Sequence, residues 1–172
     1  GVGQDIINPA DESVIGWCPH ASAEELDMAL GAADEGFKVW KNMTALARQK
    51  IMTKAADLMD ERVDYIAECL TREEGKPFKE ALDEVSWCAT AMDYYAEIAR
   101  HEAGRIAGTT VPGQFHFAVN EPLGTVVIIL PFNYPLVLMC WEAAAALAAG
   151  NAVIVKPHEQ TSLTTLKFME LF

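Results

Sequence analysis

The chain has 172 residues, of which 51% are hydrophobic and 22% are charged, and its formal net charge is −12. This length suffices for one domain with its own core, and the acidic balance argues against a surface that binds nucleic acid or an anionic membrane. Since no signal-like segment opens the sequence and no apolar run approaches about 18 residues, we expect a cytoplasmic protein without a membrane span.

The first hundred residues are rich in acidic side chains and in helical patterns. We expect two short strands, at about 6–10 and 13–16, and then three long helices, at about 22–40, 44–74 and 77–101. Ser22 and Glu25 have the spacing of a capping box, so the first helix should begin there. Gly75 should end the second helix, and Pro77 suits the first turn of the third.

Residues 104–122 form a segment in which glycine and proline separate short β-prone pieces. This pattern fits a long hairpin or an extended arm. Such an arm either packs on its own domain or adds strands to the sheet of a partner. The glycines do not favour a phosphate-binding loop, because no Gly-Lys-Ser or Gly-Lys-Thr follows them.

Residues 121–160 organise the rest of the chain. An apolar run at 126–130 predicts a strand buried on both faces, and a second run at 152–155 predicts another. Between them, the Ala-rich segment 136–149 predicts a helix that Gly150 ends. Two parallel strands joined by a helix form a right-handed crossover, whose ligands gather at the carboxyl ends of the strands. The predicted fold is therefore α/β, with a Rossmann-like parallel sheet and an N-terminal helical layer.

Cysteine and histidine are scattered along the chain, without the spacing of a metal site. No Cys-x-x-Cys pair occurs among the four cysteines, which are Cys18, Cys69, Cys88 and Cys140. We therefore expect no bound metal and no disulfide, and we expect the thiols to be reduced and mostly buried.

Asn133 lies after the first of the two apolar strands, in a loop that runs from Pro131 to Pro135. The loop contains no glycine, so it is not the Gly-x-Gly-x-x-Gly turn of a dinucleotide fold. A rigidly held Asn amide is a neutral donor of the kind that an oxyanion hole needs. Asn is also a common cap just before a helix, and the spacing alone favours that role. Both interpretations stay open at this point.

Lys156 and Glu159 follow the second apolar strand, about 25 residues beyond the first loop. An acidic residue in this place holds the adenosine-ribose hydroxyls in dinucleotide folds, and a lysine can reach a ribose hydroxyl or a phosphate. The alternative is an ordinary ion pair on the surface at a strand exit. The two residues by themselves do not decide between these alternatives.

Seven short motifs follow one another in unbroken order along nearly the whole chain. They are Ile7-Asn8-Pro9-Ala10, Ala21-Ser22-Ala23-Glu24, Glu74-Gly75-Lys76-Pro77, Glu121-Pro122-Leu123-Gly124, Pro131-Phe132-Asn133-Tyr134-Pro135, Leu147-Ala148-Ala149-Gly150-Asn151 and Lys156-Pro157-His158-Glu159. Together they resemble the aldehyde dehydrogenase superfamily. The resemblance raises the functional interpretation of Asn133, Lys156 and Glu159 above the structural alternatives.

The resemblance implies oxidation of an aldehyde to a carboxylic acid with NAD(P)+. In this superfamily a cysteine thiolate attacks the aldehyde, hydride passes to the nicotinamide, and a glutamate assists hydrolysis of the acyl-enzyme. The resemblance implies that this cysteine and this glutamate lie beyond Phe172. The sequence also stops inside a further helix that Thr161 and Ser162 can cap, which leaves the predicted sheet incomplete. We therefore expect the N-terminal part of a longer enzyme, inactive by itself. The alternative is a non-catalytic nucleotide-binding or oligomerisation fragment.

The resemblance also implies a division of the chain into parts. Residues 1–103 match the helical part of the cofactor-binding domain, 104–121 match a β-hairpin oligomerisation arm, and 122–172 match the start of the Rossmann-like core. The implied partners are a small-molecule aldehyde and further copies of the chain, in a homodimer or homotetramer. No nucleic acid and no membrane are implied.

Asn133 matches the side chain that donates to the oxyanion in this superfamily. Cofactor contacts are implied at both strand ends, by Ile129, Leu130, Pro131, Phe132, Lys156, His158 and Glu159. The implied wall of the aldehyde tunnel includes Tyr134, Leu138 and Trp141. Because His158 stands near the ribose where a small residue is usual, we expect NAD as the cofactor, with NADP as the alternative. No metal is implied.

Overall fold

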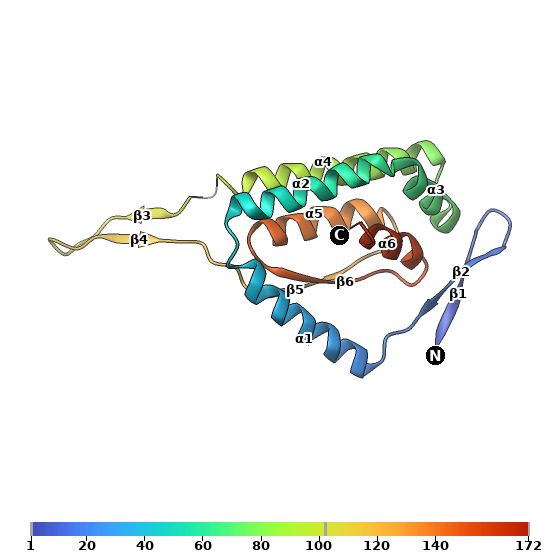
Figure 1. Ribbon diagram of the computed structural model, residues 1–172, viewed down its shortest axis with the longest axis horizontal. Coiled ribbons are helices and arrows are strands. Elements are labelled where there is room, and N and C mark those ends of the chain that lie inside the picture. The colour runs from blue at the N-terminus through green and yellow to red at the C-terminus, as the bar shows by residue number, and fades with distance from the viewer. Residues whose placement is uncertain (1, 102, 172) are drawn as a thin grey trace.

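The computed structural model describes residues 2–101 and 103–171, which form a layered α/β body with a hairpin extending from one end (Figure 1). In chain order the elements are β1 (Gly3–Ile7), β2 (Val14–Pro19), α1 (Ala23–Trp40), α2 (Ala45–Glu61), α3 (Val63–Glu74), α4 (Phe78–Ile98), β3 (Arg105–Ala107), β4 (His116–Ala118), β5 (Thr125–Ile129), α5 (Pro135–Ala148), β6 (Ala152–Lys156) and α6 (Ser162–Met169). Helices α2 and α4 form one outer layer, α5 lies between them and the β5–β6 pair, and α1 covers the other side (Figure 1).

The two apolar strands pair in parallel, with Thr125 opposite Ala152 at one end and Ile129 opposite Lys156 at the other. Helix α5 connects the strands and packs against both. The strand–helix–strand unit predicted from the hydrophobic runs is therefore confirmed, and with it the α/β fold class. Because the pair is parallel, the loops that follow β5 and β6 meet at the same edge of the sheet.

The predicted burial of β5 on both faces is wrong for the described residues. Ile128 is buried, whereas Val127 and Ile129 are 55% and 72% exposed. Side chains alternate between the faces of a strand, so one face carries Ile128 toward α5 and the other carries Val127 and Ile129. Helix α1 covers that second face chiefly over β6 and diverges from the sheet along its length (Figure 1).

The single helix predicted at 44–74 is instead two helices, α2 and α3. They meet at Arg62, whose backbone leaves the helical region with φ −118° and ψ 15°. The Arg62 N–H bonds to the carbonyl of Met59, three residues back, so the last turn of α2 is tightened. No glycine or proline marks this break in the sequence. The change of direction lets α3 pack against both α4 and α6.

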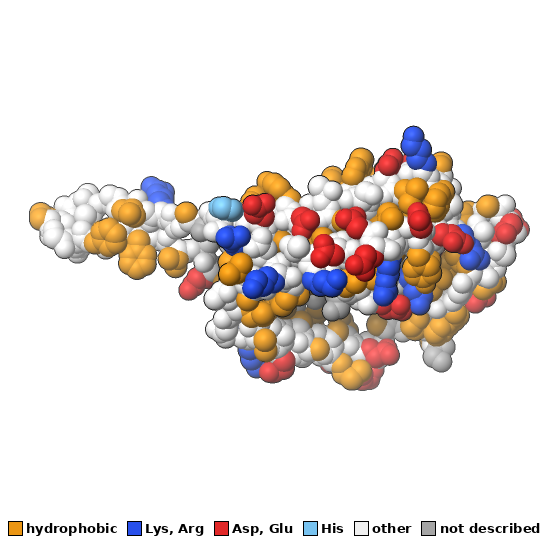
Figure 2. Space-filling model, turned by 45° about the horizontal axis from the view of Figure 1, so that its top comes forward, with side chains coloured by type: hydrophobic (Ala, Val, Ile, Leu, Met, Phe, Trp, Pro, Cys, Tyr) orange, Lys and Arg blue, Asp and Glu red, His pale blue; other side chains and the backbone are white. Residues whose placement is uncertain are grey.

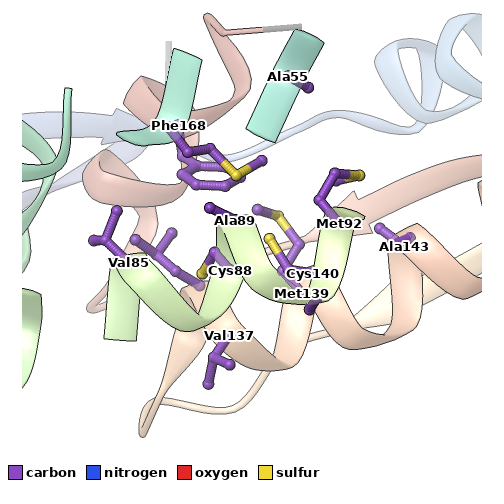
Figure 3. Packing of buried hydrophobic residues seen from close by; sticks show 14 of the residues in the cluster. Ala55, Val85, Cys88, Ala89, Met92, Val137, Met139, Cys140, Ala143 and Phe168 are labelled. Atoms are coloured by element: carbon purple, nitrogen blue, oxygen red, sulfur yellow. The ribbon is translucent and has the colours of Figure 1, made fainter. Parts of the chain in front are cut away.

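The hydrophobic core is centred on α4, which packs between α2 and α5. Val85, Cys88 and Met92 of α4 lie close to Met139 and Cys140 of α5 (Figure 3). Alanines such as Ala81, Ala89 and Ala144 separate these larger side chains and allow the helices to approach closely. The four cysteines are free thiols; Cys88 and Cys140 are buried, and Cys18 and Cys69 are half-buried. Desolvation raises the pKa of the Cys88 thiol.

Local sequence signals set several helix ends as expected. The Ser22 N–H donates to Glu25 Oε2 at 2.7 Å, and the Glu25 N–H donates to Ser22 Oγ at 3.2 Å, which confirms the predicted capping box. Gly75 ends α3 in the left-handed region, with φ 89°. Pro77 occupies the N-cap position of α4 and not its first turn. Within the described residues, no helix combines the length and the apolar character needed to cross a membrane.

The first turn of α6 is capped by a carboxylate from α3. Glu73 of α3 is buried and accepts hydrogen bonds from the N–H groups of Leu163 and Thr164, each at 2.7 Å. Desolvation raises the pKa of Glu73 in spite of these hydrogen bonds. The exposed capping residue Glu25 behaves in the opposite way, because the hydrogen bond from the Ser22 N–H lowers its pKa.

The two capping carboxylates should make the free energy of unfolding depend on pH in opposite directions. Because the folded-state pKa of Glu73 is raised, the folded chain holds that proton more tightly than the unfolded chain, and the free energy of unfolding falls as pH rises above 4.5. The lowered pKa of Glu25 gives a contribution that is present above 4.5 and lost as pH falls below it. In urea titrations over a series of pH values, Glu73→Gln should make the fall at rising pH smaller, and Glu25→Gln should make the loss at low pH smaller. Changes of the same sign in both variants would contradict the opposite pKa shifts of the two carboxylates.

Candidate functional site

The candidate site lies where β5 and β6 end, next to the hairpin formed by β1 and β2 (Figure 1). Beyond the last paired residues, the Leu130 N–H donates to the Lys156 carbonyl at 3.0 Å, so the pairing continues into the loops. Residues 130–134 then lead into α5, and residues 157–161 lead into α6. The two loops that carry the predicted polar site residues are therefore neighbours.

Asn133 is exposed in the bend before α5. The N-cap residue of α5 is Tyr134, not Asn133, and its side chain forms no capping hydrogen bond. The interpretation of Asn133 as a helix cap is therefore wrong. Among residues 2–101 and 103–171, no hydrogen bond involves the Asn133 side chain. Its amide is thus a free donor at the carboxyl end of β5.

Tyr134 adopts a left-handed backbone conformation, with φ 50° and ψ 48°. For a bulky residue with a Cβ this conformation costs about 1–3 kcal/mol and persists only where the surroundings hold it. The surroundings here are charged: Lys76 Nζ lies 4.0 Å from the centroid of the Tyr134 ring. The turn that carries Asn133 is therefore strained, and the contact between Lys76 and the Tyr134 ring stabilises it.

The start of α5 is capped by a side chain from α4. Glu84 has no exposed surface, and its Oε1 accepts hydrogen bonds from the N–H groups of Leu136 and Val137, at 2.9 Å and 3.2 Å. Its other oxygen, Oε2, is paired with the ammonium of Lys76. A buried carboxylate next to the positive end of a helix is stabilised both by the unpaired N–H groups and by the helix dipole.

Lys76 joins two carboxylates in this buried network. Besides its contact with Glu84, its Nζ lies 3.0 Å from Glu74 Oε2, and the side chains of all three residues are less than 10% exposed. Burial by itself lowers the pKa of Lys76, but the hydrogen bonds with Glu84 and Glu74 outweigh it, and the pKa is raised. Burial raises the pKa of Glu74, an effect that Lys76 partly offsets.

At the end of β6, Lys156 and Glu159 form a loose contact of 4.0 Å between Nζ and Oε2, with both side chains more than half exposed. A hydrogen bond from its own backbone N–H, with the nearby charge of His158, lowers the pKa of Glu159. The His158 ring meets the Phe132 ring edge-on, with 5.7 Å between their centroids, so it links the two loops. Glu159 therefore presents an ionised carboxylate at the strand end.

A cavity of about 600 Å³ lies beside these loops. It is lined by parts of four segments: Gln4, Asp5 and Ile6 of β1, Glu73 and Glu74 of α3, Phe132 of the first loop, and His158 and Glu159 of the second. The Gln4 side chain donates to the Glu159 carbonyl at 2.8 Å. Strand β1 thus borders the candidate site on the side of Glu159, which the sequence patterns did not indicate, whereas Asn133 and Lys156 do not line this cavity.

The other predicted site residues divide by exposure. Ile129, Pro131, Phe132, Tyr134 and Trp141 are exposed near the end of β5 or on the first turns of α5, and Leu138 is half-buried. Leu130 differs, because its side chain belongs to the core, so only its backbone can face a ligand. Tyr134, Leu138 and Trp141 follow at spacings of four and three residues, which places them on one face of α5.

Sequence reasoning missed the buried charged residues beneath the Asn133 loop, Lys76, Glu74 and Glu84, and it missed Glu73 as the cap of α6. Lys76 drew notice only as part of a motif. A signal for Glu84 exists, because it occupies the same helical stripe as the buried residues Ala81 and Cys88. A carboxylate on an apolar stripe has to find a partner when it is buried.

Comparison with known proteins gives consistent matches over the whole chain. The model of the aldehyde dehydrogenase family matches residues 2–172. A solved aldehyde dehydrogenase from Brucella melitensis biovar abortus 2308 superposes with a TM-score of 0.97 at 36% identity, covering 99% of this chain and 35% of that one. An NADP-dependent enzyme of E. coli gives a TM-score of 0.97 at 32% identity, with 99% and 36% covered. A point mutant of betaine aldehyde dehydrogenase from Staphylococcus aureus, solved with NAD+, gives 0.94 at 32% identity, with 99% and 35% covered. The chain thus spans about a third of the length of these solved chains.

Two substitutions of Glu84 should separate its two contributions to stability, the cap of α5 and the ion pair with Lys76. Glu84→Ala removes the cap of α5 and leaves Lys76 with one carboxylate, so the free energy of unfolding should fall by about 3–5 kcal/mol. Glu84→Gln keeps an oxygen for the Leu136 and Val137 N–H groups and should cost clearly less. Chemical denaturation measures both, with Asp83→Ala, at the exposed neighbouring position, as the control. Equal losses for Ala and Gln would show that the cap contributes nothing.

Proposed function

The chain belongs to the aldehyde dehydrogenase family, and from this premise we propose that it is the N-terminal part of an enzyme that oxidises an aldehyde to a carboxylic acid with NAD(P)+. The observation that carries the proposal is the shared edge of the β5–β6 pair. A free amide donor, Asn133, and an ionised carboxylate, Glu159, follow the two neighbouring strand ends. A neutral donor suits a developing oxyanion, and a carboxylate suits hydroxyl groups of a sugar.

We propose that Lys156 and Glu159 hold the adenosine ribose of the cofactor. Their heads are exposed and only loosely paired, at 4.0 Å, so a ribose diol can replace that contact without leaving a buried charge unpaired. Phe132 and His158 pack against each other beside them and form a rigid wall. The residues present therefore fit a dinucleotide. When bound, NAD(P)+ supplies the oxidant, since its nicotinamide accepts hydride.

In the proposed reaction, Asn133 donates a hydrogen bond to the aldehyde oxygen as negative charge develops on it. Such a preorganised donor contributes most where no reorganisation is needed at the moment of reaction. The nucleophilic cysteine and the general-base glutamate belong, in this proposal, to sequence beyond residue 172. Cys140 does not serve as the nucleophile, because it is buried in the core on α5 (Figure 3). Tyr134, Leu138 and Trp141 form one wall of the aldehyde tunnel.

We further propose that the hairpin of β3 and β4 is an assembly arm that binds a second copy of the chain. Ile106 pairs directly with Phe117, so both side chains lie on the same face of the hairpin. That face is apolar and open, with Ile106 74% and Phe117 67% exposed, and the arm projects from the body (Figure 2). A two-stranded hairpin is only marginally stable by itself, so a partner surface would stabilise it.

Two substitutions should separate chemistry from cofactor binding in the complete enzyme. Asn133→Ala should lower kcat by about 10²–10³-fold and leave the cofactor dissociation constant nearly unchanged, because one oxyanion donor is lost. Glu159→Gln should chiefly raise the cofactor dissociation constant, because the ribose hydroxyls lose an ionised acceptor. NAD(P)H absorbance with a panel of aldehydes measures kcat, and fluorescence titration measures cofactor binding.

The controls for this pair are Asn42→Ala, after α1, and Glu68→Gln, on α3, both exposed and away from the carboxyl ends of β5 and β6. Equal loss of rate and affinity in Asn133→Ala would assign Asn133 a purely structural role. Absence of turnover with short, long, aromatic and amino aldehydes would overturn the proposed activity. An intact mass equal to that of residues 1–172 alone would favour the alternative of a non-catalytic fragment.

Charge on the apolar face of the arm should disrupt assembly. In the double variant Ile106→Lys, Phe117→Lys, the mass of the assembly should fall toward that of one subunit, because two ammonium groups would have to be desolvated at the contact. Sedimentation equilibrium measures this mass. The thermal midpoint of the monomeric body should change little, since both side chains are exposed. His116→Lys, on the opposite face of the same strand, is the matched control. An unchanged mass in the double variant would contradict the proposed arm.

A further inference from the structure

The direction of the Asn133 amide depends on its neighbours. Among the described residues its side chain forms no hydrogen bond, so only the backbone of the loop can orient it. On one side the loop is held by the hydrogen bond from Leu130 to Lys156. On the other side it continues into Tyr134, whose left-handed conformation determines the direction in which the chain enters α5. An interaction that fixes the backbone conformation of Tyr134 therefore also fixes the direction of the Asn133 side chain.

Lys76 reaches Tyr134 because of the turn between α3 and α4. Gly75 ends α3 with φ 89°, a conformation that residues with a Cβ rarely adopt. A Cβ at this position would also lie only 2.7 Å from Pro9 Cγ. The turn thus directs the next residue, Lys76, inward, where its side chain is only 8% exposed. A cation is rarely so buried unless it is paired.

The ammonium of Lys76 contacts three groups that surround the loop. Glu84 holds the first N–H groups of α5, and Glu74 Oε2 lies 3.0 Å from the ammonium. The Tyr134 ring covers the ammonium at 4.0 Å, the geometry of a cation–π contact. A lysine ammonium has three N–H donors, which matches this set of partners. The Tyr134 ring contacts the Lys76 ammonium directly, and the start of α5 is linked to the same ammonium through Glu84.

We propose that Lys76 is a positioning residue that, together with Glu74 and Glu84, fixes the turn at Tyr134 and thereby aims the Asn133 amide at the aldehyde oxygen. This inference rests on the proposed role of Asn133. Lys76 itself lies beneath the loop and acts through Tyr134. Loss of its charge frees the ring and leaves two buried carboxylates without their cation, so the loop shifts and the donor no longer meets the oxyanion.

A double-mutant cycle in the complete enzyme tests the proposal. Lys76→Met keeps the length of the side chain and removes the charge; we expect kcat to fall by about 10²-fold, the effect of misplacing a catalytic group by about 1 Å, with the cofactor dissociation constant unchanged. In the Asn133→Ala background the donor is already absent, so Lys76→Met should lower kcat less than about threefold further. A merely structural role of Lys76 would lower kcat by the same factor in both backgrounds.

The control is Lys79→Met, an exposed lysine in the first turn of α4, which should leave kcat unchanged. If Lys76→Met does not fold, the cycle is run with Lys76→Arg, which keeps the charge but has a larger planar head that cannot occupy the same place under the ring. Multiplicative losses, or no loss from the Lys76 substitution, would overturn the positioning role alone. Full activity of Asn133→Ala would instead overturn the proposed function of Asn133, and the positioning role with it.

Discussion

The hydrogen bonds that Glu84 and Glu73 accept at the starts of α5 and α6 are the interactions on which the remaining structure depends. Each helix follows a strand of the parallel pair, and its first N–H groups have no partner within the helix. The sequence around these starts contains no side chain that caps them. The acceptors come instead from α4 and α3. The helical layer and the sheet are therefore joined by charge-assisted hydrogen bonds as well as by apolar contact.

This arrangement explains how an irregular loop is held rigidly at a surface site. The residues that face a ligand, such as Asn133 and Glu159, are exposed and have few contacts of their own. The groups beneath them are buried and paired by charge, with Lys76 between Glu74 and Glu84. Exposed side chains with few contacts are thus placed above a layer of buried, paired charges. The proposed chemistry and the proposed cofactor contacts both use this division.

Local patterns determine which parts of the fold and of the site could be predicted. The apolar runs indicate β5 and β6, and the Ser22–Glu25 spacing indicates the start of α1, because these signals involve residues a few positions apart. The break at Arg62 and the cap of α5 by Glu84 arise from contacts between elements distant in sequence, which no local pattern distinguishes. For the same reason, spacing alone favours Asn133 as a cap, although a carboxylate from another helix has that role. The family resemblance identifies the ligand-facing residues, but a motif does not state what lies beneath them.

The separation along the chain between each capping carboxylate and its helix bears on how the molecule is synthesised. Glu84 and Glu73 precede the amides they bind by 52 and 90 residues. The N-terminal part of a chain leaves the ribosome first, so both carboxylates emerge well before their partners. Because burial of an unpaired carboxylate is costly, we expect Glu73 to stay hydrated until the amides of α6 emerge, whereas Glu84 can pair with Lys76 before α5 is made. Packing of α3 around Glu73 is therefore expected to be completed only once α6 has emerged.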